Sequence, residues 1–203
     1  MSKKAYSQEE RKQIYYDLLA AGRQLFARQG YRQTNLSDIL GQVGISKNFF
    51  YTYFSSKEEF VAKVLASQQP LLVELARQIM AKPGISWQEA VRQFLSICAD
   101  GANNGIFIMT LADQEAVFRT LKLEDFTQFH KAQEDFYSAL LDVWGFSNID
   151  CDVVKIFANI ALSSLIVHKS MAESIRPLFA DKADETMRWQ IDSLIWQMEK
   201  FYK

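Results

Sequence analysis

The stretch from Thr34 to Glu59, TNLSDILGQVGISKNFFYTYFSSKEE, indicates two short helices joined by a tight turn and followed by the start of a longer helix. Asn35 can cap the first helix. The apolar positions of that helix recur at 3.6-residue spacing, at Leu36, Ile39, Leu40 and Val43. Gly44 follows where a left-handed residue commonly ends a helix, and Ser46 can cap the second helix.

The second short helix combines polar and aromatic residues on the side away from its apolar neighbours. Ile45, Phe50 and Phe54 can point inward. The residues left to face outward or sideways are Lys47, Asn48, Phe49, Tyr51, Thr52 and Tyr53. Two helices around a short glycine-containing turn form a helix-turn-helix, whose second helix enters the major groove of DNA. The sequence therefore predicts a DNA-binding head.

A wider set of positions, within roughly residues 10–65, has a recognisable order and spacing. These positions are Ala20, Ala21, Leu25, Phe26, Gly30, Tyr31, Thr34, Ile39, Gly44, Ile45, Ser46, Phe50, Tyr51, Tyr53, Phe54, Lys57 and Glu58. In type and spacing they resemble the TetR/AcrR family of one-component bacterial transcription regulators. Leu40 and Val43 depart from that pattern, where small alanines are common. Asn48 and Tyr53 depart from it on the expected DNA face, which affects the operator sequence rather than the binding mode.

The resemblance implies an all-α protein of about nine helices. A three-helix helix-turn-helix domain would occupy residues 1–55, and a helical effector-binding and dimerisation domain would occupy residues 56–203. Residues 56–81 would form the helix that links them. The implied protein is a homodimeric regulator, most often a repressor, that binds a palindromic operator and is released by a small apolar or amphipathic effector. It implies no catalytic residue, cofactor or metal.

Composition supports a helical fold by itself. The 203 residues, of which 49% are hydrophobic, suffice for a small module and a domain with a sizeable core. Only three prolines and eight glycines occur. Residues 1–67 hold ten Lys and Arg against six Asp and Glu, a net charge of +4, and the remainder carries −5. This asymmetry fits a protein that contacts phosphate at one end, with chance fluctuation as the alternative.

Cysteine usage and apolar segments favour a cytoplasmic protein. Cys98 and Cys151 show no C-x-x-C spacing, and the N-terminal segment has no apolar signal core. The longest mostly apolar stretch, residues 156–167, is interrupted by polar residues and falls short of the roughly 20 residues of a membrane span. We expect a buried or interface helix there and no membrane contact.

Local signals place the other helices. Ser7 and Glu10 form a capping-box pattern before a helix that Gly30 ends, and Ser56 begins the linking helix, which Pro70 is expected to kink. Further helices are expected at about residues 86–101, 106–117, 123–144, 150–172 and from 181 or 184 to 202, with a turn at 103–105.

The expected DNA face combines phosphate and base contacts. Lys57 can meet a phosphate near a helix start, and tyrosine and threonine hydroxyls can donate to phosphate oxygens. Lysine suits guanine, asparagine suits adenine, and an apolar ring can meet a thymine methyl. The predicted set is Thr34, Ser37, Ser46, Lys47, Asn48, Phe49, Tyr51, Thr52, Tyr53 and Lys57.

Each of these assignments has a simpler alternative. Tyr51 and Tyr53 could be half-buried packing residues. Lys57 could be a solvated cation paired with Glu58 or Glu59. The assignment of Phe49 is the hardest to dismiss, because an exposed phenylalanine beside Lys47 and Asn48 needs a partner surface.

Residues 86–172 are rich in aromatic residues that could line an apolar cavity, with histidine and glutamine orienting a guest. The predicted ligand residues are Phe94, Cys98, Met109, Phe118, Phe129, His130, Gln133, Phe136 and His168. The alternative is plain hydrophobic core. The two histidines have no partner at metal-ligand spacing, so no metal site is expected.

The last two long helices carry extensive apolar surface, which predicts pairing with a second copy in a four-helix bundle. The predicted interface residues are Phe157, Ile160, Leu165, Ile191, Leu194, Ile195 and Met198. The alternative is that these side chains complete the core of each monomer.

Two other classes of function have less support in the sequence. An enzyme with His130 or His168 as general base has no nucleophile, phosphate loop or metal spacing to support it. A helical lipid-binding or adaptor protein could keep the helix-turn-helix as a packing unit only. We therefore expect a ligand-responsive, DNA-binding transcription regulator.

Overall fold

The structure, a computed structural model, describes residues 6–146, 150–173 and 179–202. Those residues form ten α-helices and one 3₁₀ turn, with no strand among them, which confirms the all-α prediction. The sequence predicted about nine helices. The additional one is α6 (Gly101–Asn104), a single turn of helix in the segment where a loop was expected.

The N-terminal head contains α1 (Gln8–Gln33), α2 (Leu36–Val43) and α3 (Lys47–Phe50). The predicted capping box is present, since Glu10 N–H donates to Ser7 Oγ at 3.2 Å and Ser7 N–H donates to the Glu10 carboxylate at 2.8 Å. Gly30 interrupts the helical path with φ 77°, and one further turn follows it. The helix was expected to stop at Gly30, whereas the structure bends there and continues.

The turn of the helix-turn-helix forms where the sequence predicted it. Gly44 adopts the left-handed conformation with φ 73°, and its N–H donates to Leu40 O at 2.8 Å. Ser46 then caps α3, because its Oγ accepts from Phe49 N–H at 3.3 Å. These local bonds set the direction in which α3 leaves α2.

Helix α4 (Lys57–Met80) links the head to the rest of the chain. Ser56 Oγ accepts from Glu59 N–H at 3.0 Å, but the Glu59 carboxylate accepts from Ser55 instead of Ser56, so only half of the predicted capping box forms. Pro70 lies inside this helix and does not end it.

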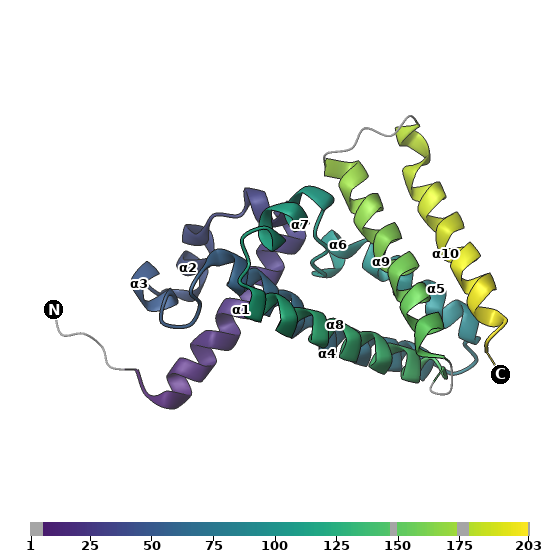
Figure 1. The fold of residues 1–203 in the computed structure, drawn as a ribbon, viewed down its shortest axis with the longest axis horizontal. Coiled ribbons are helices and arrows are strands. Elements are labelled where there is room, and N and C mark those ends of the chain that lie inside the picture. The colour runs from purple at the N-terminus through teal and green to yellow at the C-terminus, as the bar shows by residue number, and fades with distance from the viewer. Residues whose placement is uncertain (1–5, 147–149, 174–178, 203) are drawn as a thin grey trace.

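The C-terminal body is built from the remaining helices. They are α5 (Trp87–Ala99), α6, α7 (Leu111–Phe118), α8 (Leu123–Val143), α9 (Cys151–Glu173) and α10 (Ala183–Glu199), with a 3₁₀ turn at Ala180–Lys182. Figure 1 shows α8 running beside α4, and α9 and α10 forming a pair at the end of the molecule far from α3.

The helix predicted from residue 106 begins later, at Leu111. The reason is local, since Thr110 has an extended backbone and its Oγ1 accepts from Asp113 N–H at 3.1 Å. The preceding residues form a non-helical segment in which Ile106, Phe107 and Met109 are buried.

Aromatic rings fill the core of the head. Phe26, Phe50, Phe54 and Phe60 are almost fully buried, and their ring centroids lie 4.9–5.9 Å apart where they pair. Burying each such ring contributes on the order of 2 kcal/mol. Helix α1 approaches α4 so closely that a Cβ on Gly22 would lie 2.5 Å from the Phe60 ring.

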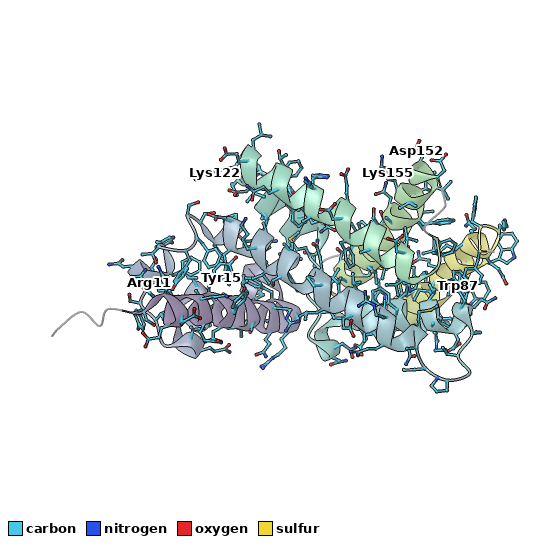
Figure 2. The ribbon with its side chains drawn as sticks, turned by 90° about the horizontal axis from the view of Figure 1, so that it is seen from below. Arg11, Tyr15, Trp87, Lys122, Asp152 and Lys155 are labelled. Atoms are coloured by element: carbon cyan, nitrogen blue, oxygen red, sulfur yellow. The ribbon has the colours of Figure 1, made fainter. Side chains whose placement is uncertain are left out.

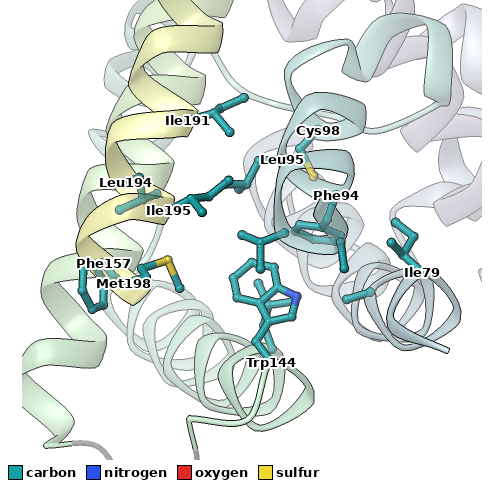
Figure 3. Close-up of a cluster of buried hydrophobic side chains, with 14 of the residues drawn as sticks. Ile79, Phe94, Leu95, Cys98, Trp144, Phe157, Ile191, Leu194, Ile195 and Met198 are labelled. Atoms are coloured by element: carbon teal, nitrogen blue, oxygen red, sulfur yellow. The ribbon is translucent and has the colours of Figure 1, made fainter. Parts of the chain in front are cut away.

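A second core lies in the body, between the C-terminal half of α4, α5 and the helices that follow (Figure 3). Its buried members are Leu72, Ala76, Ile79, Trp87, Ala90, Val91, Phe94, Leu95, Cys98, Ile106, Leu140, Leu141, Trp144, Phe146, Phe157, Leu165, Met187, Ile191, Leu194, Ile195 and Met198. Helix α4 therefore takes part in both cores.

Among the described helices, one segment is long and apolar enough to cross a membrane, Asp152–Met171 of α9, with a mean hydropathy of 1.3. The sequence analysis considered only the shorter stretch of residues 156–167, which is below the length of a membrane span. In the structure Phe157, Ala158, Leu165 and Ile166 of this helix are buried against other helices of the body.

Candidate nucleic-acid interface and internal cavity

Helix α3 presents its polar side chains to solvent. Lys47 and Asn48 are exposed, and the exposed fraction of Tyr51 is 46%. Phe50, on the opposite side of this helix, is fully buried in the head core. Lys47, Asn48 and Tyr51 therefore form an open polar face at the tip of the head.

Phe49 is covered by the protein itself, contrary to the prediction of a free ring. Its ring lies 4.8 Å from that of Tyr6 and 5.3 Å from that of Tyr53, centroid to centroid. The Arg11 guanidinium lies 5.5 Å from the same ring. Because Tyr6, Arg11 and Tyr53 of the same chain contact this ring, Phe49 is half-buried without DNA.

Two of the predicted hydroxyl donors are already used. Tyr53 Oη donates to Arg11 O at 3.0 Å, and Thr52 Oγ1 donates to Phe49 O at 2.7 Å. Tyr53 thus ties α3 to α1, which agrees with the packing alternative for this residue. Figure 2 shows Arg11 near the beginning of α1.

Thr34 does not reach the surface. Its exposed fraction is 1%, and its Oγ1 donates to Gly30 O at 2.7 Å and accepts from Gln29 Nε2 at 3.2 Å. The predicted contact between the Thr34 hydroxyl and a phosphate is therefore wrong for this arrangement. The hydroxyl instead satisfies a carbonyl that the kink at Gly30 leaves without a helical partner.

Lys57 is neither solvated nor paired with Glu58 or Glu59. Its ammonium donates to Tyr31 O at 2.9 Å and to Thr34 O at 2.7 Å, and it lies 4.1 Å from the centroid of the Tyr31 ring. Partial burial lowers the pKa of this ammonium. Lys57 thus holds the end of α1 against the start of α4, and its ammonium has one N–H left for another acceptor.

A charge-assisted hydrogen bond also joins the end of α1 to the start of α4. Tyr31 Oη donates to the Glu58 carboxylate at 2.7 Å, and burial together with this carboxylate raises the pKa of Tyr31 well above its usual range. Tyr31 and Lys57 therefore fix the orientation of the helix-turn-helix relative to α4. The predicted DNA residues still open to solvent are Ser37, Ser46, Lys47, Asn48, Tyr51 and Thr52.

The body contains a cavity of about 820 Å³. Eight of the nine predicted ligand residues line it, namely Phe94, Cys98, Met109, Phe118, Phe129, His130, Gln133 and Phe136. The ninth, His168, is wrong, because its Nε2 lies 3.6 Å from Asp184 Oδ1 between α9 and α10 rather than at the cavity. The volume falls in the range of sites for small organic molecules.

Sequence reasoning missed the polar residues that α4 brings to this cavity. Gln68 Nε2 donates to Phe107 O at 2.8 Å, and Phe107 N–H donates to Gln68 Oε1 at 3.0 Å. Gln69 also lines the cavity. Two adjacent buried glutamines in a linking helix were the available signal, because buried amides usually serve a specific partner.

The predicted dimer residues are mostly internal. Six of the seven are buried within the chain, which agrees with the alternative that they complete the core of each monomer. These six are Phe157, Leu165, Ile191, Leu194, Ile195 and Met198, whereas Ile160 is exposed. The apolar side chains that α9 and α10 do expose are Ile156, Ile160, Trp189 and Trp196.

Trp189 and Trp196 lie seven residues apart on α10, with exposed fractions of 71% and 62%. With Asp192 and Ser193 between them they line a shallow groove of about 310 Å³. Residues two helical turns apart share a face, so these indoles form one apolar stripe on the outside of α10.

Comparison with known proteins gives a match in the head. The model of bacterial regulatory proteins of the tetR family matches residues 18–64. The TetC protein of transposon Tn10 from Escherichia coli is 29% identical over 68 residues, which are 34% of this chain and 34% of that protein. The chain thus matches about a third of the length of this curated relative.

Solved structures are similar over nearly the whole chain. A TetR transcriptional regulator from Rhodococcus sp. RHA1 aligns with a TM-score of 0.58 at 16% identity, over 95% of this chain and 99% of that one. A TetR-family regulator from Pectobacterium atrosepticum gives 0.57 at 16% identity over 97% and 98%. One from Legionella pneumophila gives 0.55 at 16% identity over 94% and 98%. At such identities the likeness establishes the fold.

Lys57 and the exposed Lys47 allow a matched test of this geometry. We predict that Lys57→Met lowers the free energy of unfolding by about 1–3 kcal/mol, because two charge-assisted hydrogen bonds to carbonyls are lost. Lys47→Met makes the same change at an exposed position and should alter it by less than about 0.5 kcal/mol. Urea unfolding followed by circular dichroism measures both values. Equal and small effects would contradict the anchoring role of Lys57.

Proposed function

We propose that this chain is a DNA-binding transcription regulator of the TetR family, and that it acts as a homodimeric repressor that leaves its palindromic operator when a small apolar or amphipathic molecule enters the cavity. The observation that carries the proposal is the course of α4. The same helix begins at the helix-turn-helix and lines the cavity with Leu65, Gln68, Gln69 and Leu72. We take residues 1–55 as the DNA-binding domain, 56–203 as the effector-binding and dimerisation domain, and the cytoplasm as its location.

In the proposed complex, α3 lies in the major groove. Lys47, Asn48 and Ser37 contact base edges, and the hydroxyls of Ser46 and Tyr51 contact the phosphate backbone, while the Thr52 hydroxyl stays bonded to Phe49 O. Four other predicted residues position α3 and α1 through ring contacts and hydrogen bonds within the protein. They are Phe49, Tyr53, Thr34 and Lys57. The third N–H of Lys57 remains available to a phosphate.

Phe107 gives the cavity a direct contact with the head. This residue lines the cavity, and its ring lies 5.1 Å from that of Phe26 in the head core. The side chain of Gln68 holds both its backbone N–H and its carbonyl. A guest that displaces Phe107 therefore acts on α4 and on α1 together.

A second contact runs from α8 to the head. Lys122 Nζ donates to Ser55 Oγ at 3.3 Å, and Lys63 Nζ donates to Gln128 Oε1 at 3.0 Å. Helix α8 also lines the cavity with Phe126, Phe129 and His130. In the proposed mechanism the guest shifts α4 and α8, and the two heads of the dimer no longer fit successive major grooves.

We propose that the dimer forms through the apolar stripe on the outside of α10, instead of through the residues predicted from the sequence. Two exposed tryptophans in one stripe are unusual for a surface that meets only water, and tryptophan is enriched at the centres of interfaces. Ile156 and Ile160 add exposed apolar area on α9. We place the second copy against these four side chains.

The DNA-binding proposal predicts separable effects of head mutations. Lys47→Ala and Asn48→Ala should each reduce affinity for the preferred duplex by about 5- to 150-fold, the range for a lost base contact of 1–3 kcal/mol, and relax sequence preference. Lys131→Ala, at an exposed lysine of α8, is the control and should change affinity less than about twofold. Selection from random duplexes followed by fluorescence anisotropy at several salt concentrations measures these effects.

Salt-independent or absent binding to duplex DNA would contradict the proposed complex. The adaptor interpretation, with the helix-turn-helix as a packing unit, would then take its place. Unchanged preference in both head variants would instead refute only the residue assignment.

The coupling proposal predicts that Gln68→Leu separates effector binding from DNA release. Loss of both bonds to Phe107 should reduce the effector-induced change in DNA affinity by at least about fivefold, equivalent to about 1 kcal/mol of coupling, while the effector still binds. Gln78→Leu removes an exposed amide of the same helix and should leave the change intact. Anisotropy titrations with and without effector give both ratios, and equal ratios in the two variants would exclude the Gln68–Phe107 contact as the route.

The dimer proposal predicts that Trp189→Glu combined with Trp196→Glu yields a folded monomer, since both side chains are exposed in the single chain and a buried charge opposes association. Tyr16→Glu, at a similarly exposed aromatic residue of α1, should leave the dimer intact. Analytical ultracentrifugation measures the mass of each variant. A dimeric tryptophan variant would show that another surface mediates pairing.

A further inference from the structure

The buried part of the cavity lining is uncharged among the described residues. The charged residues that line the cavity, Glu134, Asp135 and Lys155, are all exposed at its edge. Lys155 Nζ lies 3.7 Å from Oδ1 of Asp152, which belongs to the same helix. Because an ionised group inside an apolar site needs an opposite charge beside it, a guest held in the buried part is expected to be neutral.

The same part of the lining holds two hydrogen-bond donors without acceptors in the described chain. These are Gln69 Nε2 and Trp144 Nε1, and both side chains are more than nine-tenths buried. An indole N–H can only donate, and a glutamine amide can present its N–H₂ after rotation about its last bond. Buried donors left without an acceptor are rare in native proteins.

Neighbouring contacts hold Trp144 in this orientation. Trp87 Nε1 donates to Trp144 O at 3.0 Å, and the Phe94 ring packs edge-on at 5.4 Å. Figure 3 shows the indole of Trp144 in the body core between α5 and α10. The indole therefore cannot turn readily toward solvent to satisfy its N–H.

Three other polar side chains of this part of the lining are either already hydrogen-bonded or protonated. The Gln68 amide is committed to Phe107. Burial raises the pKa of the Cys98 thiol to about 12, and burial raises the pKa of Tyr137 far above its usual range, so both keep their protons. The buried part of the lining therefore offers N–H, O–H and S–H groups and no anion.

We propose that the cavity takes an uncharged aromatic or alicyclic carbonyl compound whose oxygen accepts hydrogen bonds from Trp144 and Gln69. Phe94, Phe129 and Phe136 enclose the apolar part of such a molecule. The inference rests on the proposed function, in which this cavity is the effector site. It adds the chemical class of the effector, defined by neutrality and by a hydrogen-bond acceptor.

Three probes of one shape separate these properties. They are 2-acetylnaphthalene, which is neutral with a carbonyl, 2-ethylnaphthalene, which has no acceptor, and 2-naphthoate, which is an anion. Isothermal titration calorimetry with the full chain measures their dissociation constants. The dissociation constant of the ketone should be about 3- to 30-fold lower than that of the hydrocarbon, and the anion should bind most weakly. Hydrocarbon or anion binding equal to or tighter than that of the ketone, or no binding by any probe, overturns the proposal.

Two substitutions locate the hydrogen bonds. Gln69→Leu and Trp144→Phe each remove one N–H and keep an apolar side chain, so each should lower the ketone-to-hydrocarbon ratio about 3- to 10-fold. Gln78→Leu lies outside the cavity and should leave the ratio unchanged. Circular dichroism melts check that the variants fold, and the two variants test the proposal independently. A ratio unaffected in a folded Gln69 or Trp144 variant overturns the role of that donor.

DNA binding measured with the same probes tests the ligand class and the proposed regulatory function separately. Preferential ketone binding without any change in DNA affinity would support this ligand class and refute the proposed regulatory function. Release of DNA by the hydrocarbon as effectively as by the ketone would support the regulatory function and refute the ligand class.

Discussion

The structure depends on one helix that is buried at both ends in different hydrophobic cores. The first half of α4 contributes Phe60, Val61 and Val64 to the head core, and the second half contributes Leu72, Ala76 and Ile79 to the body core. An α-helix is stiff along its axis, and each half is anchored by several buried side chains. A displacement of one half is therefore carried to the other unless a core is broken. Gln68 and Gln69 lie between the two halves, where the cavity meets the head.

Some residues of the head hold α3 in place, and others form the face of α3 that is exposed to solvent. Aromatic rings that could have faced DNA are packed against the start of α1, and the Lys57 ammonium is bound by carbonyls of the α1–α2 connection. These contacts leave Lys47, Asn48 and Tyr51 open on a helix of only four residues. A helix this short has little stability alone, so its orientation rests on Phe50, Phe54 and the ring contacts behind it.

The sequence predicted the features that local chemistry decides. The caps at Ser7 and Ser46 and the left-handed Gly44 occur as expected, and helix periodicity identified α4 and α5. It failed where partners come from far along the chain. Phe49 is covered by Tyr6, and Lys57 bonds to the residues around Tyr31, contacts that no spacing within the motif indicates. The apolar stripes of α9 and α10 were predicted to form a dimer interface but are mostly buried within the chain, because periodicity cannot tell a face that meets its own chain from one that meets a second copy. The unpaired donors Gln69 and Trp144 depend on three-dimensional packing and were not predicted.

In the proposed mechanism, occupancy of the cavity reaches the head through α4 and Phe107. Amide hydrogen exchange, resolved by mass spectrometry, tests it most directly in protein saturated with a compound that releases it from DNA. If α4 and Phe107 carry the effect of the guest, exchange changes at residues 106–109 and in the first half of α4, residues 57–68, together with the cavity-lining parts of α5 and α8. Changes confined to α5, α8 and α9, with residues 57–68 and 106–109 exchanging as in the free protein, would contradict it.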